Sequence, residues 1–327
     1  MTNLNGRGRD AEADHGETLL EDRVLVARIC WYYFKEGQTQ ENIAQRLNMT
    51  RKRVNRILGL ARDSGFVQFT IADPAGQRTA LEEQLVTRYG LQHAIVVPTP
   101  MSDMDVRSLV GAAAGHYVGE RLPIGGSLGI SWGGTINAAA QNLRPRSGQD
   151  TKVVLLCGGL AESAPINPYD NAAMIARALG ARCYYLTAPM FVESEEFRDL
   201  IVRSEPVRSV LAMVPALDMA LLSAIDLSEQ SKALEYNVIS RKTWASLRAA
   251  GAVGDICGHY LDRDGKPVDH PLCQRTINPS LAQIHRIRTR VLAAGGKQKV
   301  DIIRAGLLAG FCHVLVTDEV AAQRLLS

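Results

Sequence analysis

The sequence lacks the patterns of zinc-binding, membrane-spanning and secreted proteins. The six cysteines form no C-x-x-C pair, and no Cys/His cluster has zinc-ligand spacing. No apolar run reaches the roughly 18 residues of a membrane span, and the polar first 18 residues do not resemble a signal peptide. We therefore expect a protein of the reducing cytoplasm, with no metal and no other cofactor.

Catalytic patterns are also missing. The seven histidines are scattered, and no Ser/His/Asp or Cys/His arrangement stands out. The glycine-bearing turns form no G-x-G-x-x-G, and no Walker lysine follows them. With 327 residues and a hydrophobic fraction of 46%, the chain is long enough for two domains with a sizeable core.

What the sequence does contain is a pattern for two short helices between Gln40 and Arg62. Asn48 and Met49 form the turn between them, where Asn tolerates a left-handed conformation better than most residues. Thr50 can cap the second helix, because its hydroxyl can accept from a free amide one turn on. The apolar positions recur at helical spacing: Ile43, Ala44 and Leu47 on the first helix, and Val54, Ile57 and Leu58 on the second.

The outer face of the second helix is basic and carries an amide. Residues 40 to 62 hold six Lys and Arg against one acid, whereas the whole chain has a net charge of only +3. Arg and Lys can contact phosphates or guanine, and Asn can pair with adenine, so this face suits the major groove of DNA. The alternative is a solvated basic corner. The predicted DNA contacts are Thr39, Gln40, Thr50, Arg51, Lys52, Asn55 and Arg56.

We expect four segments: a disordered tail over 1–17, a helix-turn-helix domain over 18–72, a linker over 73–80 and an α/β domain over 81–327. A first helix is expected from about Leu19 to Lys35. Its Trp31-Tyr32-Tyr33-Phe34 run could stack single-stranded bases, but helical spacing favours core packing. The alternation over Phe66 to Ile71 predicts a short strand of a wing.

Strand and helix patterns alternate beyond the linker, which is typical of an α/β domain with a mainly parallel sheet. Strands are expected over 94–97, 127–132, 152–157, 182–186, 219–225 and 314–317, and helices over 81–89, 106–122, 171–179, 194–204, 243–250 and 300–308.

Glycine-bearing corners predict ligand contacts where strands end, as in open α/β sheets. Ser131, Gly133, Gly134 and Thr135 form one corner, where amides at a helix start could hold an anion; a tight turn explains them almost equally well. A second corner leads from Cys157 to Asp170 and Asn171, and a third contains Asp255. Lys299 is expected at a helix start, where a cation opposes the helix dipole and an anionic or oxygen-rich ligand would offset it.

Four stretches resemble the SorC-type sugar-binding transcriptional regulators, which are allied to the DeoR group. They are TQENIAQRLNMTRKRVNRILGLARDSGFV at 39–67, GISWGGT at 129–135, GAVGDICGHYLDRDGKPV at 251–268 and AAGGKQKVDIIRAGLLAGFCHVLVTDEVAAQRLL at 293–326. The resemblance covers about 24 to 327. It implies an N-terminal helix-turn-helix, winged-helix-like, and a C-terminal domain with a sugar-isomerase-like (Rossmann-like) fold that binds its ligand without turning it over.

The resemblance also implies roles for individual residues. Gly133, Gly134 and Thr135 match the family's phosphate- or hydroxyl-binding loop, Asp255 its acidic residue and Lys299 the lysine after its paired glycines; Asp170 and Asn171 fall near its polar loop. Two positions depart from the family. Cys157 stands where phosphosugar-binding relatives can carry Arg, and Ser223-Ala224-Ile225 replaces a Gly-Ile-Gly corner. The first departure favours a free polyol, a ketose or a monophosphate.

These observations predict a transcriptional regulator of a carbohydrate or polyol operon. Its expected partners are double-stranded operator DNA and a sugar, polyol or sugar-phosphate effector. The chain is also expected to pair with itself as a dimer or tetramer. The alternative is a sugar-phosphate isomerase or deaminase with a nucleic-acid-binding appendage, against which the missing acid/base constellation argues. A purely architectural DNA-binding protein would not explain the large α/β domain.

Overall fold

The computed structural model describes residues 22–63, 66–67, 74–100, 103–145 and 150–327. The chain divides into two compact units, residues 1–72 and 73–327. No helix among the described residues is long and apolar enough to cross a membrane. The expected tail over 1–17 and most of the expected strand over 66–71 lie outside the described residues. Helix α5 (Pro74–Tyr89) occupies most of the stretch that we expected to be a linker.

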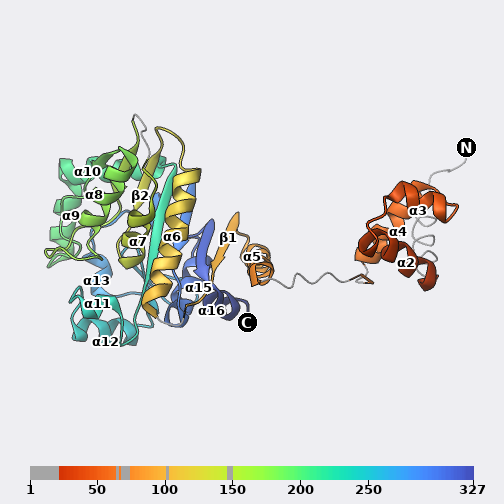
Figure 1. Ribbon diagram of the computed structural model, residues 1–327. Helices are drawn as coiled ribbons and strands as arrows, with labels where there is room; N and C mark the ends of the chain where they lie inside the picture. The colour runs from red at the N-terminus through yellow and green to blue at the C-terminus, as the bar shows by residue number, and fades with distance from the viewer. Residues whose placement is uncertain (1–21, 64–65, 68–73, 101–102, 146–149) are drawn as a thin grey trace, which may run out of the picture. The chain divides into compact units, whose positions relative to one another are not determined.

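The first unit consists of α2 (Arg23–Cys30), a short π-helix (Trp31–Lys35), α3 (Gln40–Arg46) and α4 (Arg51–Asp63) (Figure 1). Its core contains the apolar residues that helical spacing predicted on α3 and α4, with Leu47 only partly buried. Asn48 adopts the expected left-handed conformation, with φ of 50°. The prediction of core packing for the aromatic run is wrong for two of its residues. Trp31 is 57% and Phe34 37% exposed, because the π-helix shifts the spacing on which the prediction rests.

The second unit is built on seven parallel strands in the order β1-β9-β8-β5-β2-β3-β4. Their bounds are β1 His93–Val97, β2 Ser127–Ile130, β3 Lys152–Leu155, β4 Arg182–Tyr184, β5 Met219–Asp226, β8 Thr289–Ala293 and β9 Val314–Asp318. All eight residues of β5 are buried, as a central strand of a parallel sheet requires. β8 was not predicted from the sequence.

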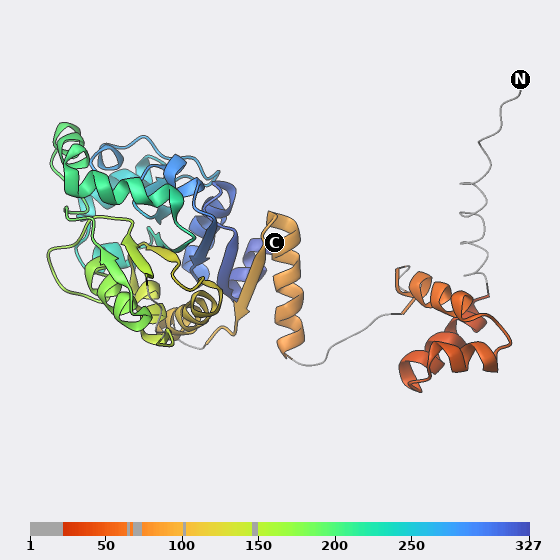
Figure 2. The same ribbon diagram turned by 90° about the horizontal axis from the view of Figure 1, so that it is seen from above.

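Helices cover both faces of this sheet (Figures 1 and 2). α6 (Asp103–Arg121), α7 (Gly134–Asn142) and α8 (Pro168–Leu179) pack on one face, and α10 (Glu205–Met213), α15 (Val300–Leu308) and α16 (Glu319–Leu326) on the other. The remaining helices are α9 Glu195–Arg203, α11 Lys232–Glu235, α12 Arg241–Ala249, α13 Pro271–Gln274 and α14 Leu281–His285, with 3-10 turns over Val214–Ala216 and Lys297–Lys299.

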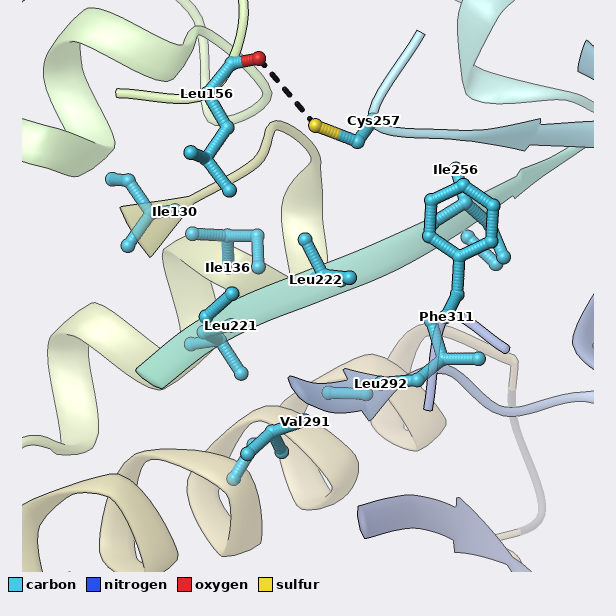
Figure 3. Close-up of a cluster of buried hydrophobic side chains, with 14 of the residues drawn as sticks. Ile130, Ile136, Leu156, Leu221, Leu222, Ile256, Cys257, Val291, Leu292 and Phe311 are labelled. Atoms are coloured by element: carbon cyan, nitrogen blue, oxygen red, sulfur yellow. Dashed lines mark hydrogen bonds between the residues drawn. The ribbon is translucent and has the colours of Figure 1, made fainter. Parts of the chain in front are cut away.

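A hairpin that the sequence did not reveal extends the end of β5. β6 (Gly254–Ile256) pairs antiparallel with Ala224–Asp226 and with β7 (His259–Leu261). Cys257 and Gly258 turn the chain, and their φ angles of 55° and 79° match a two-residue hairpin turn. Asp255 therefore lies within a strand and not in the glycine-bearing corner after a strand that we expected. Figure 3 shows the apolar side chains beneath the hairpin, where the thiol of Cys257 donates to the carbonyl of Leu156.

Candidate functional site: a basic helix face and a sheet crevice

The predicted DNA contacts lie on one side of α3 and α4. The side chains of Arg51, Lys52, Asn55 and Arg56 are exposed, whereas Val54 between them is fully buried. The spacing predicted this division, because a helix that buries one apolar stripe turns the other positions outward. The structure thus brings these four side chains to one exposed face.

The predicted cap at Thr50 is present, and Thr39 caps α3 in the same way, which was not predicted. The hydroxyl of Thr39 accepts from the amide of Asn42 at 3.2 Å, and that of Thr50 accepts from the amide of Arg53 at 3.2 Å. These bonds fix where α3 and α4 begin. The other amides of each first turn have no intrahelical acceptor, which is the property that phosphate binding at a helix start uses.

Two side-chain contacts organise this face and were not predicted. The side-chain amide nitrogen of Gln40 on α3 donates to the side-chain oxygen of Asn55 on α4 at 3.2 Å, so the two side-chain amides lie next to each other. Arg46 lies over the ring of Tyr32 and 3.5 Å from Glu36, so this cation of the basic cluster holds the helices together.

The second candidate site lies at the carboxyl ends of β2 and β5. The chain leaves these neighbouring strands in opposite directions along the sheet, and such a switch point opens a crevice where α/β proteins bind ligands. Ser131 and Ser223 join the strand ends: the amide of Ser223 donates to the Ser131 hydroxyl at 3.0 Å, and the Ser223 hydroxyl donates to the carbonyl of Trp132 at 2.5 Å. The Ser223 corner, which departs from the family, is thus hydrogen-bonded to the predicted glycine corner.

The paired glycines shape the start of α7. Gly133 has φ of 118°, a conformation that side chains rarely adopt, and a Cβ there would lie 2.8 Å from the Ser223 hydroxyl. Among the described residues, no acceptor faces the amides of Gly134 and Thr135, which form the first turn of the helix. The guanidinium of Arg107 lies beside them, 3.5 Å from where a Cβ of Gly134 would sit.

Lys299 is buried close to this corner. It is 7% exposed and caps the start of α15, and no hydrogen-bond or ion-pair partner of its ammonium is found in the part of the chain that the structure describes. Burial lowers the pKa of Lys299; Asp226 opposes that shift, and Arg107 and Lys232 add to it. Lys232 itself pairs with Glu235. The crevice therefore concentrates positive charge that Asp226 only partly offsets.

Asp255 lies on the other side of the glycine corner. Its carboxylate accepts from the indole nitrogen of Trp132 at 3.2 Å and from the amide of Gly258 at 2.6 Å. Burial raises its pKa to about 7, although both hydrogen bonds work against this shift. At neutral pH, Asp255 can thus hold a proton, and it fixes the Trp132 ring against the hairpin.

Asn171 joins the glycine corner to α8, but Asp170 does not reach it. Asn171 is fully buried and donates to the carbonyls of Gly133 and Pro165 at 3.3 Å each. Asp170 accepts from the Ser163 hydroxyl at 2.8 Å in the exposed loop before the helix. Both belong to the first turn of α8, where an acidic residue favours the helix dipole.

The sequence analysis missed several residues of this crevice. Arg107 stands within the helix expected over 106–122, and Asp226 follows the end expected for the strand at 225. Arg107 and Lys299 approach each other only in the folded chain, because the starts of α6 and α15 lie at the same edge of the sheet although the two helices cover opposite faces. A separate surface hollow of about 390 Å³ lies between Ser228, Arg248, Arg263 and Gln298, and none of the predicted effector residues lines it.

Comparisons with known proteins identify the family of the chain. The family model described as "Putative sugar-binding domain" matches residues 73–327. The chain is 31% identical over 314 residues to the transcriptional regulator LsrR of Klebsiella pneumoniae, covering 94% of each chain. It is 28% identical over 310 residues to the deoxyribonucleoside regulator of Bacillus subtilis, covering 94% of this chain and 98% of the relative.

The fold matches a full-length regulator. The crystal structure of the sorbitol operon regulator SorC from Klebsiella pneumoniae superimposes with a TM-score of 0.74 and 25% identity, covering 94% of this chain and 100% of that one. The chain therefore belongs to the sugar-binding transcriptional regulators of the SorC type. These relatives are regulators and not enzymes, so the isomerase or deaminase alternative is set aside.

Proposed function

We propose that the chain binds the operator of a carbohydrate or polyol catabolic operon as a symmetric dimer or tetramer in the cytoplasm, and that a sugar-like effector controls this binding. The observation that carries the proposal is the exposed basic face of α4, which lies opposite its buried apolar stripe. One recognition helix per half-site would lie in the major groove. Its contacts would come from Arg51, Lys52, Asn55 and Arg56, and phosphate contacts from Thr39, Gln40 and Thr50 at the helix starts.

The effector is proposed to bind at the crevice between β2 and β5. Two amides at the start of α7 have no acceptor among the described residues, and a buried cation lies nearby; both are features of a polar ligand site. The cations that line the surface hollow, Arg248 and Arg263, are exposed. The proposed effector contacts are Ser131, Gly133, Gly134, Thr135, Asp170, Asn171, Asp255 and Lys299. Of these, Asp170 has the least support, because it faces the exposed loop.

A gel-shift experiment tests the proposal. DNA from upstream of the protein's own gene and an unrelated fragment of equal length are titrated with the full chain, with and without polyols, sugars and sugar phosphates. Preferential binding of the upstream DNA, changed by one compound that is recovered intact, would support the proposal. Equal binding of both fragments under every condition would contradict it.

A further inference from the structure

Three helix starts meet at the carboxyl edge of the sheet, and two of them carry a cation. α6, α7 and α15 follow the parallel strands β1, β2 and β8, so their positive ends lie at this edge (Figure 1). Two of these helices also carry a cation near the start: Arg107 in the second turn of α6 and Lys299 at the cap of α15. Lys299 opposes the dipole of α15, which Asp301 in the first turn of that helix offsets only in part, so a bound anion would stabilise this position.

Lys299 is also buried, so its positive charge is costly unless a partner balances it. An ammonium that is more than nine-tenths buried normally has an ion-pair or hydrogen-bond partner. Among the described residues, Asp226 is the acid that acts on it, but the two make no ion pair within 4 Å, and the amide of Ser228 donates to the Asp226 carboxylate at 2.9 Å. Lys299 and Arg107 repel each other across the same space. A bound anion would remove both penalties.

The start of α7 provides matching donors. The amides of Gly134 and Thr135 lack acceptors among the described residues, and the Arg107 guanidinium lies next to them. A planar guanidinium can donate two parallel hydrogen bonds to a phosphate, which an ammonium cannot do. Two amides, one guanidinium and one ammonium therefore suit the tetrahedral oxygens of a single phosphate group.

The opposite end of the crevice has no such set of donors. Cys157, at the position where related proteins can carry Arg, is fully buried, and burial beside Cys257 raises the pKa of its thiol well above the ordinary value. Asp255 at this end would repel a second anionic group whenever it is ionised. The charges thus favour one anionic group, at the α7 end only.

We propose that Arg107 determines effector specificity, holding together with Lys299 and the α7 amides the phosphate of an effector with a single phosphate monoester. The proposal rests on the proposed function in that the crevice is taken as the effector site. Arg107 supplies, from α6, a second cation beside Lys299 at the α7 end of the crevice.

Inorganic phosphate is the probe for the first test. The full chain is titrated with phosphate by calorimetry at constant ionic strength, with chloride as the replaced anion. Three variants are compared: Arg107→Gln, which removes the charge; Arg107→Lys, which keeps the charge but not the planar fork; and Arg121→Gln, a matched exposed arginine at the far end of the same helix. Circular dichroism checks that each variant folds.

We expect saturable binding of phosphate by the natural chain and by Arg121→Gln. Losing a charge-assisted hydrogen bond should weaken binding about ten-fold or more in Arg107→Gln, with Arg107→Lys in between. Unchanged affinity in Arg107→Gln, or no saturable phosphate binding by the natural chain, would overturn the proposal.

A second measurement separates this proposal from the proposed function. Binding of the upstream DNA is measured with a free polyol and with its monophosphate, in the natural chain and in Arg107→Gln. A response to the monophosphate that Arg107→Gln loses supports the assignment. An equal response of both proteins to the free polyol would overturn it while leaving the regulator intact. Loss of phosphate binding in Arg107→Gln without any operator binding would support the anion site and contradict the regulator.

Discussion

The indole nitrogen of Trp132 donates to the carboxylate of Asp255 at 3.2 Å, which joins the corner after β2 to strand β6. These residues lie 123 positions apart in the chain, and both are 2% exposed. The bond anchors the glycine corner of the proposed effector site to the hairpin that extends β5. A change in the charge of Asp255 should therefore reach the site directly.

The first prediction concerns pH. Burial raises the pKa of Asp255 from 3.8 to about 7, so between these values the folded protein holds a proton that the unfolded chain releases. Stability from this group is full below about pH 4 and falls as pH rises to about 7, by about 4 kcal/mol in total. Asp255→Asn should lack this fall. Its stability deficit in urea denaturation should shrink from pH 4.5 to pH 7.5; a deficit that stays constant would show that Asp255 does not titrate in this range.

The second prediction concerns the basic face of α4. Arg51→Ala with Arg56→Ala should weaken operator binding at least ten-fold and reduce the slope of log affinity against log salt by about 0.9 for each phosphate that the protein no longer neutralises. Fluorescence anisotropy across a salt series measures both. The control is Arg177→Ala with Arg182→Ala, two exposed arginines of the second unit that give the same change in net charge. If both pairs behave alike, net charge explains the effect, and α4 is not the recognition helix.

The third prediction concerns the turn at Asn48. A β-branched residue is poorly tolerated at φ of 50°, so Asn48→Val should destabilise the first unit by about 1–2 kcal/mol, whereas Asn48→Gly should have little effect. Hydrogen exchange of the α3 and α4 amides would detect the difference. Equal protection in the two variants would mean that the turn does not require the left-handed conformation.

The fourth prediction concerns the glycine corner. Gly133→Ala forces a side chain into a conformation reserved for glycine and against the Ser223 hydroxyl, so we expect a loss of about 1–3 kcal/mol or more. Adding Ser223→Ala removes the 2.8 Å approach to the hydroxyl but not the backbone strain. The double variant should therefore be more stable than the sum of the two single changes implies, as measured by a double-mutant cycle. Strict additivity would show that the close approach is relieved in another way.

The first unit was largely predictable from the sequence, because its signals are local. The apolar spacing of α3 and α4, the cap at Thr50 and the left-handed Asn48 each depend on residues within one or two turns. The aromatic run is the exception, since a π-helix changes the spacing that assigns Trp31 to the core.

The crevice was only partly predictable, because its chemistry depends on contacts between distant segments. Gly133, Gly134 and Lys299 carry local signals, namely paired glycines after a strand and a cation at a helix start. Arg107 carries none, and only the packing of α6 against α7 reveals it. The short strand β6 was predicted to be a glycine-bearing corner, because three residues are too few for an alternating pattern and their pairing partner lies about 30 residues earlier.

The central claim is that effector and operator binding are coupled within one chain, and a thermodynamic cycle tests it most directly. Operator affinity is measured with and without a saturating monophosphate effector, and effector affinity with and without operator. Coupled sites must change each other's affinity by the same factor, typically about 5- to 150-fold. We predict that the effector changes operator affinity, and that the operator changes effector affinity by the same factor. An operator affinity that stays the same when the effector site is saturated would contradict the coupling.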